Sequence, residues 1–274
     1  MRLEVFGAGP RRTGTSWLYT CLQQHDQLCF PKGVKETAFL NARFDKGWAW
    51  YWSHFQHWHE GQMCAEMGPG AFAVPQAVSR LWEHNSGCRI IVNLRDPAAR
   101  SFSLWALFKN RGVVNGGFLE ATRTEPRILE SSRYRKYLKK WIQTFGRAQV
   151  HVILLEDIAS SPHTVLDGVY HFLGIRAVPP PPGAREGVGA RRMAAVPALA
   201  RVAERGGSWL RERRLYGPIE LAKRLGLKRF VFGVSRQASA DLDPDVRQAL
   251  IREFEPDIAY VEDLLDRPLH NWRQ

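Results

Sequence analysis

The feature that most constrains this chain is a short apolar strand that runs into a glycine-containing turn and then into a helix. Residues 3–8 are the expected strand, Gly9 to Gly14 is the turn, and residues 15–24 are the expected helix. In such a segment the backbone N–H groups of the turn converge, and the helix dipole favours a negative charge beside them. The segment therefore predicts an anion site at the edge of a parallel sheet.

The rest of the chain alternates between apolar runs and helical patterns. Further strands are expected over 62–66, 89–94 and 150–155, and helices over 74–84, 97–110, 134–145, 160–173 and 243–265. This alternation predicts an α/β fold with a P-loop-like parallel β-sheet of four to five strands, flanked by helices on both faces. We expect one domain over 1–274, with a flexible, Pro/Gly-rich and basic segment at about 176–214 and basic helical sequence at about 192–227.

Charge and composition limit the classes of ligand and the cellular compartment that we expect for this chain. The net charge of +12 points to an anionic ligand. Nucleic acid is not expected, because long Lys/Arg tracts and zinc-finger or helix-turn-helix signatures are missing. No run approaches the roughly 18 apolar residues of a membrane span, and the N-terminus does not read as a signal peptide. A cytoplasmic protein with four buried, reduced cysteines is expected.

The turn resembles two nucleotide-binding patterns without matching either. Gly9 and Gly14 have the spacing of the nucleoside-triphosphate P-loop, and Ser16 stands at its magnesium-binding hydroxyl. Thr15, however, replaces the lysine that holds the β- and γ-phosphates. The dinucleotide pattern G-x-G-x-x-G also fails, because Arg12 takes the third glycine. A P-loop kinase acting on a small molecule stays open as an alternative.

The stretch from Pro10 to Trp17, P-R-R-T-G-T-S-W, resembles the 5′-phosphosulfate loop of sulfotransferases that use 3′-phosphoadenosine-5′-phosphosulfate (PAPS). That loop typically reads P-K/R-x-G-T-S/T-x. The resemblance implies that Arg12 bridges the sulfuryl group and the leaving 5′-phosphate, which makes it catalytic. The residues that it implies for donor binding are Arg11, Arg12, Thr13, Gly14, Thr15, Ser16 and Trp17.

Two more motifs extend the resemblance. Arg95 ends a strand and Ser103 follows eight residues later, as in the family's 3′-phosphate motif. The segment Lys35-Glu36-Thr37-Ala38-Phe39-Leu40 is similar to K-E-x-x-F-F in the branch with heparan-sulfate and bacterial carbohydrate or metabolite sulfotransferases. The resemblance implies that Glu36 is the catalytic base. Lys35 would keep Glu36 ionised or contact the donor.

The chain departs from the family pattern at two places. Relatives often have E-K-T/S-P after the second strand, but here Met67 stands in place of the lysine. The late basic donor-binding loop has only a faint counterpart, for which Arg191 and Arg192 are the candidates. The resemblance implies PAPS as donor, 3′-phosphoadenosine-5′-phosphate (PAP) as product and no metal. It also implies a hydroxyl of a carbohydrate or small metabolite as acceptor. A non-catalytic protein that binds anionic polysaccharide on the same fold is the other alternative.

Three clusters have a structural and a functional interpretation. The aromatic segment from Trp48 to Trp58 is either core or an acceptor wall. The histidines at 54, 57 and 59 are expected at the surface rather than on a metal. A basic helical face is either solvated or part of a groove for an anionic acceptor; it comprises Arg133, Arg135, Lys136, Lys139 and Lys140. Neither acceptor identity nor oligomeric state follows from the sequence.

Overall fold

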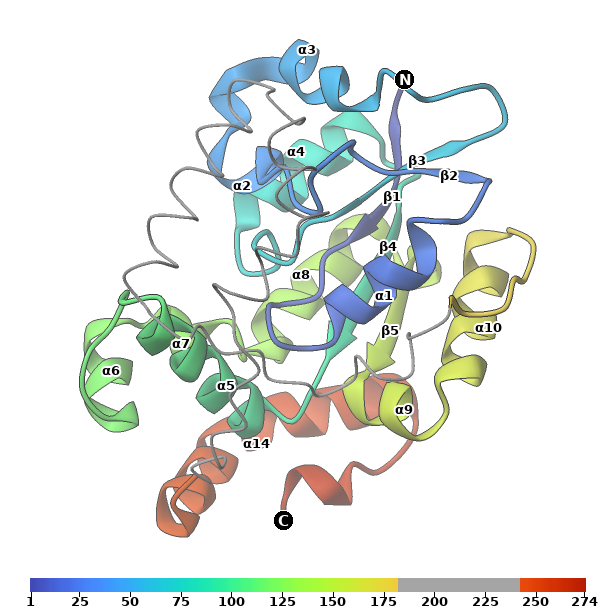
Figure 1. Ribbon diagram of the computed structural model, residues 1–274. Coiled ribbons are helices and arrows are strands. Elements are labelled where there is room, and N and C mark those ends of the chain that lie inside the picture. The colour runs from blue at the N-terminus through green and yellow to red at the C-terminus, as the bar shows by residue number, and fades with distance from the viewer. Residues whose placement is uncertain (182–241) are drawn as a thin grey trace.

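The computed structural model describes residues 1–181 and 242–274 (Figure 1). Its centre is a five-stranded, all-parallel sheet in the order β2-β3-β1-β4-β5. The number and direction of the strands confirm the expected sheet. The strands are β1 (Leu3–Gly7), β2 (Leu28–Cys29), β3 (Met63–Met67), β4 (Arg89–Leu94) and β5 (Val150–Leu154).

The helices follow the expected pattern, and the structure adds several short helices that were not predicted. The expected helix over 160–173 begins at Pro162 and ends at Leu173, and a further helix that was not predicted, Leu155–Ser160, precedes it. The short helices between the Lys-Glu motif and β3, and those between the expected helices over 97–110 and 134–145, were not predicted. The basic sequence at 192–227 lies outside the described residues. The α-helices are α1 (Thr15–Leu22), α2 (Phe39–Ala42), α3 (Gly47–Trp52), α4 (Pro75–His84), α5 (Pro97–Asn110), α6 (Phe118–Thr124), α7 (Arg127–Glu130), α8 (Tyr134–Phe145), α9 (Leu155–Ser160), α10 (Pro162–Leu173) and α14 (Pro244–Leu265).

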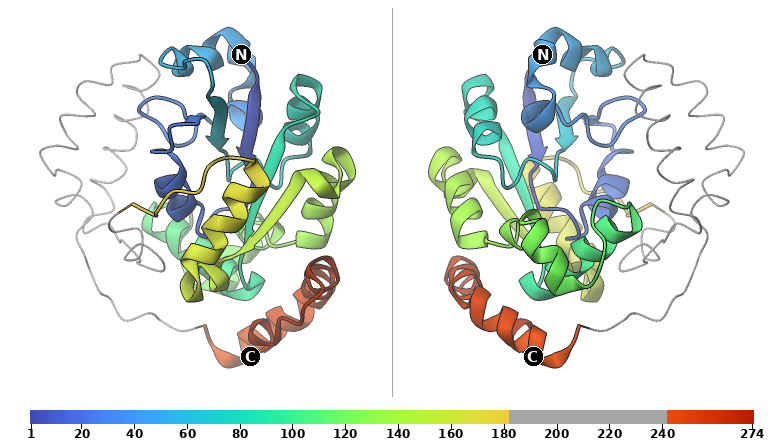
Figure 2. Two further views of the ribbon diagram at one scale, coloured as in Figure 1. Left: turned by 90° about the vertical axis from the view of Figure 1, so that its right-hand side faces the viewer. Right: turned by 90° about the vertical axis from the view of Figure 1, so that its left-hand side faces the viewer.

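The sheet is buried on both faces, as its continuous apolar strands require. Successive side chains of a strand point to opposite faces. Ile90 and Val92 of β4 accordingly join the core under α4, α8 and α14, whereas Ile91 joins the core under α1, α9 and α10. Figures 1 and 2 show these two helical layers on either side of the sheet.

The strand order places the expected anion turn at a favourable point. The chain first moves from β1 to one side of the sheet, through β2 and β3, and then crosses to the other side of β1 for β4 and β5. In open parallel sheets, ligands bind beyond the carboxyl ends of the strands where the order reverses in this way. The turn after β1 and Arg95 after β4 both lie at this edge.

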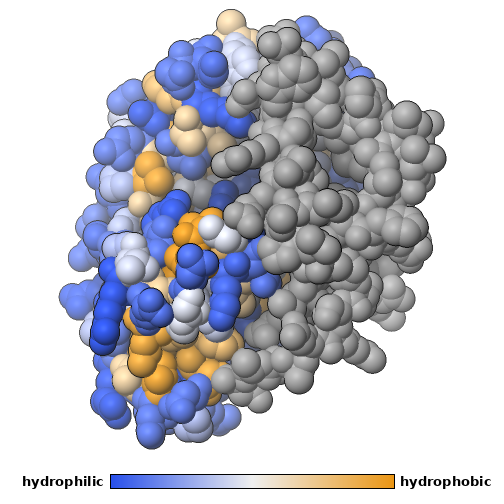
Figure 3. Space-filling model, turned by 60° about the vertical axis from the view of Figure 1, so that its left-hand side comes forward, coloured by the Kyte–Doolittle hydropathy of each residue, from blue (hydrophilic) through white to orange (hydrophobic). Residues whose placement is uncertain are grey.

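A third apolar cluster joins α5, α6, α7 and α14, and Phe102, Phe118 and Phe254 are buried in it. Figure 3 shows the side of the molecule that carries α6 and α7, where apolar patches lie between hydrophilic ones. At the margin of the cluster, Val113 and Leu119 remain 48% and 53% exposed.

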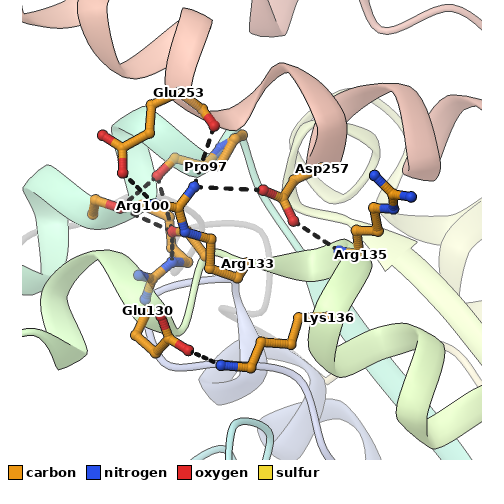
Figure 4. Close-up of polar contacts among 10 residues, drawn as sticks. Pro97, Arg100, Glu130, Arg133, Arg135, Lys136, Glu253 and Asp257 are labelled. Atoms are coloured by element: carbon orange, nitrogen blue, oxygen red, sulfur yellow. Dashed lines mark hydrogen bonds and ion pairs between the residues drawn. The ribbon is translucent and has the colours of Figure 1, made fainter.

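Part of the basic face of α8 contacts α14 and α7. The Arg133 guanidinium contacts the carboxylate of Glu253 on α14, and the Arg135 backbone N–H donates to Asp257 at 2.8 Å (Figure 4). Lys136 pairs with Glu130 in the preceding turn. These pairs engage part of the basic face within the fold, so an anionic-acceptor groove there loses support.

The aromatic segment and the cysteines are structural. Tyr51 and Phe55 are completely buried, and Trp48 and Trp52 pack against the same core, which favours the core interpretation of this segment. His54 is buried rather than at the surface. All four cysteines are free and buried, as predicted. In the described part of the chain, no helix has the length and apolar character that a membrane span requires.

Candidate active site

The turn between β1 and α1 is held tightly against the end of β4. A Cβ atom on Gly9 would lie 2.3 Å from the backbone nitrogen of Asn93, so only glycine allows this approach. Gly14 has φ 90° and caps α1 in the left-handed region, which glycine adopts without penalty. The Thr13 hydroxyl donates to the Pro10 carbonyl at 2.6 Å and closes the turn.

Arg12 connects the turn to the second predicted motif. Its φ of 77° is unusual for a residue with a side chain and costs roughly 1–2 kcal/mol. The Arg12 Nε donates to the Ser103 hydroxyl at 2.9 Å, across 91 positions of sequence. Backbone strain of this kind concentrates at functional sites. Ser103 is buried on α5, two turns after Arg95, so the two motifs meet as expected.

Lys35 connects the turn to the third motif. Its ammonium donates to the hydroxyls of Thr15 and Ser16, each at 3.1 Å. Burial lowers the pKa of Lys35, and the neighbouring Glu36 carboxylate opposes this effect. A lysine from a different segment thus brings a cation to the turn, next to the position where the P-loop pattern has its own lysine.

Glu36 lies between two cations at the rim of the turn. Its carboxylate is 3.4 Å from Arg11 Nη2 and 3.8 Å from Lys35 Nζ. The side chain is 29% exposed, so a ligand from solvent can reach it.

The segment after Glu36 is fixed by a buried carboxylate that sequence reasoning did not assign to the site. Glu66 on β3 accepts the Thr37 backbone N–H at 2.7 Å and the Thr37 hydroxyl at 2.6 Å. Burial raises the pKa of Glu66 to about 7, although both Thr37 bonds oppose the shift. In the sequence, Glu66 stood out only as the first residue of Glu66-Met67-Gly68-Pro69. Its role in holding Thr37 follows from the structure, in which it is buried and bonded to Thr37.

Arg95 lies directly after β4, at the same edge of the sheet. Its carbonyl accepts the Tyr134 hydroxyl at 2.7 Å. Asp96 caps α5 by accepting the N–H groups of Ala98 and Ala99 and also pairs with Arg247 of α14 at 2.8 Å. The bonds to Asp96 hold the start of α5, and with it the Arg95–Ser103 spacing, in place.

Arg100 is a second residue that sequence reasoning missed. Its guanidinium is completely buried and donates to the Ser132 hydroxyl at 2.5 Å and to the Ile128 carbonyl at 2.7 Å. Its Nη1 also donates to the Arg11 carbonyl at 3.4 Å, and this bond ties the turn to α5. Burial lowers the pKa of Arg100 to about 10, which leaves it cationic at neutral pH. An arginine on an amphipathic helix gives no sign of such burial.

Trp17 lies differently from the other residues predicted to bind the donor. The Trp17 side chain is buried in the core under α1, and its backbone N–H donates to the Gly14 carbonyl, so both serve the fold of the turn. Met67, at the family's lysine position, is buried in the same core. Arg191 and Arg192 lie outside the described residues. Within 1–181 and 242–274, no three His, Cys, Asp or Glu side chains come together in a way that could hold a metal ion.

Fold and site together define an α/β protein of the P-loop-like type, with a cluster of basic side chains at the carboxyl edge of its sheet and the partly exposed Glu36 carboxylate beside them. The sulfotransferase domain family matches residues 3–181, about two thirds of the chain. The chain belongs to this family.

Individual known proteins support the family assignment, although their sequence identity to this chain is low. Human heparan sulfate glucosamine 3-O-sulfotransferase 3B1 is 26% identical over 186 residues, covering 62% of this chain and 45% of that protein. Mouse bifunctional heparan sulfate N-deacetylase/N-sulfotransferase 4 is 27% identical over 188 residues, covering 61% and 22%. The chain thus spans less than half of these relatives. The crystal structure of a sulfotransferase from Alicyclobacillus acidocaldarius has the same fold, with a TM-score of 0.71, 21% identity and full coverage of both chains.

Proposed function

We propose that this protein transfers a sulfuryl group from PAPS to a hydroxyl group of a carbohydrate or small metabolite. The observation that carries the proposal is the convergence of two other motifs on the turn between β1 and α1. Ser103 is bonded to Arg12, Lys35 is bonded to Thr15 and Ser16, and Glu36 lies beside Arg11. Family membership supports the same reaction.

The residues suit the donor chemically. PAPS carries a 5′-phosphosulfate and a 3′-phosphate, both of which require cations and hydrogen-bond donors. The turn with Arg12 and Lys35 would hold the phosphosulfate, and Arg95 with Ser103 would hold the 3′-phosphate. Hydroxyls of Thr15 and Ser16 and the N–H groups of the turn add donors without charge.

In the proposed reaction, the acceptor oxygen attacks sulfur from the side opposite the leaving group. A bond forms between that oxygen and sulfur, and the bond between sulfur and the 5′-phosphate oxygen breaks. The electron pair of the broken bond stays on the phosphate of PAP, where Arg12 and Lys35 stabilise the added charge. The acceptor proton goes to Glu36 as general base.

The donor is tested by thermal unfolding with PAP or with ADP and magnesium at matched concentrations. At about 100 times its dissociation constant a ligand stabilises the fold by about 2.7 kcal/mol. We expect stabilisation by PAP. If ADP with magnesium stabilises the protein and PAP does not, the turn belongs to a kinase. In that kinase, Lys35 would take the place of the P-loop lysine, whose position in the turn is occupied by Thr15.

The base is tested separately from the donor site. We expect Glu36→Gln to lower kcat by about 10²–10⁴ while PAP still stabilises the protein. Glu83→Gln, which changes an exposed carboxyl on α4, is the matched control and should leave turnover unchanged. Normal turnover by Glu36→Gln would remove Glu36 as the base.

A further inference from the structure

The C-terminal helix α14 reaches the proposed donor site through one ion pair. Arg247 lies in the first turn of α14, and its Nη2 is 2.8 Å from Asp96 Oδ2. Asp96 directly follows Arg95, the residue proposed to hold the 3′-phosphate. The two side chains are 23% and 9% exposed, so solvent screens their charges only in part. Helix α14 lies outside residues 3–181, and the family match therefore does not include this contact.

The Asp96 carboxylate carries a charge that opposes the binding of a phosphate nearby. Its Oδ1 accepts the N–H groups of Ala98 and Ala99 at the start of α5, and its Oδ2 faces Arg247. The Asp96 backbone N–H donates to Glu156 Oε1 at 3.2 Å, which places a second carboxyl group at the same point. Like charges in a partly buried site repel more strongly than in water. These acids therefore weaken an anion site unless a cation such as Arg247 balances them.

Packing of α14 along α5 fixes where the Arg247 guanidinium lies. Leu250 and Phe254 of α14 are buried in one apolar cluster with Phe102 of α5. Figure 1 shows α14 running past the start of α5. The Arg247 Nε also donates to the Gln274 carbonyl, so the guanidinium is held by a second bond in addition to the ion pair. Its positive charge is therefore kept in one place beside α5.

We propose that Arg247 is a positioning residue of the donor site, which makes the protein select a 3′-phosphorylated nucleotide by balancing the charge of Asp96 beside Arg95. The inference rests on the proposed function, in which Arg95 and Ser103 hold the 3′-phosphate of PAPS and PAP. Arg247 acts through Asp96 and does not itself touch the nucleotide. Discrimination between PAP and a nucleotide without a 3′-phosphate then depends on α14 as well as on the two motif residues.

Calorimetry measures this discrimination as a ratio, the dissociation constant of adenosine 5′-phosphate divided by that of PAP. The two ligands differ only in the 3′-phosphate, so a general loosening of the site affects both and leaves the ratio unchanged. We expect Arg247→Gln to lower the ratio by about fivefold or more, because the Asp96 charge is then unbalanced. Arg247→Lys keeps the positive charge and should largely retain the ratio of the wild-type protein.

Two further variants separate charge balancing from a merely structural effect. Arg252→Gln makes the same change at an exposed position of α14 and should leave the ratio unchanged. Asp96→Asn removes the charge but keeps an oxygen that can cap α5, so it should not lower the ratio. In the Asp96→Asn protein, Arg247→Gln should have little further effect. If Arg247→Gln alone does not fold, as judged by its melting curve, a lower ratio in Asp96→Asn would still contradict charge balancing.

The outcomes distinguish the role of Arg247 from the proposed function. An unchanged ratio in Arg247→Gln, or an equal effect of this substitution in the wild-type and Asp96→Asn proteins, would overturn the inference. In both cases the wild-type protein still binds PAP more tightly than adenosine 5′-phosphate if the donor assignment is correct. A wild-type protein that does not distinguish the two nucleotides would instead overturn the proposed function itself.

Discussion

Replacing Glu66 by glutamine should make the stability of this protein less sensitive to a rise in pH from 5 to 8. The carboxyl is buried on β3, and burial raises its pKa from 4.5 to about 7 in the folded protein. The folded state therefore binds the proton more tightly than the unfolded chain does. As the pH rises from 4.5 through 7, the wild-type protein loses the stability that this proton contributes, because the charge is costly inside the core.

The magnitude follows from the size of the shift. At 1.36 kcal/mol per pKa unit, ionising Glu66 in the fold costs about 3 kcal/mol once the pH is well above 7. Most of this cost, about 2–3 kcal/mol, develops between pH 5 and pH 8. The side chain introduced by Glu66→Gln carries no charge, and its amide oxygen can still accept both bonds from Thr37.

Urea unfolding at pH 5, 6, 7 and 8 measures the effect. The stability of Glu66→Gln relative to wild type should rise by about 2–3 kcal/mol across this range, because the other titrating groups cancel in the difference. Glu83→Gln is the control, and its difference from wild type should stay flat. A constant difference for Glu66→Gln would show that Glu66 titrates normally and that the reasoning from burial is wrong.

Two further substitutions test the turn. Gly9→Ala places a methyl group 2.3 Å from the Asn93 backbone and should destabilise the fold by about 1–3 kcal/mol in a urea titration. Gly117→Ala, where a Cβ meets nothing within 4 Å, should change little, and equal losses in both variants would refute the close approach. Ser103→Ala removes the hydroxyl partner of Arg12 and should weaken PAP binding by about fivefold to tenfold in calorimetry. Unchanged affinity would mean that this bond does not organise the donor site.

Local sequence determined the elements that frame the site. The strand before Gly9, the turn to Gly14 and the helix after it are short-range features, set by apolar patterning and by the need for left-handed backbone at Gly14. The helix that begins after Asp96 followed from an N-cap and a proline at its first position. The parallel sheet followed from the alternation of such elements, and the resemblance indicated which motifs belong together.

Only the tertiary structure decided how side chains from distant segments meet. The Arg12–Ser103 bond spans 91 positions, the Glu66–Thr37 bonds span 29, and the contact of Arg100 with the Arg11 carbonyl spans 89. None of these follows from local pattern, because β3 and β4 become neighbours of β1 only through the order of the strands. Burial, which turns Glu66 into a carboxyl with a pKa of about 7, depends in the same way on what the completed fold places around it.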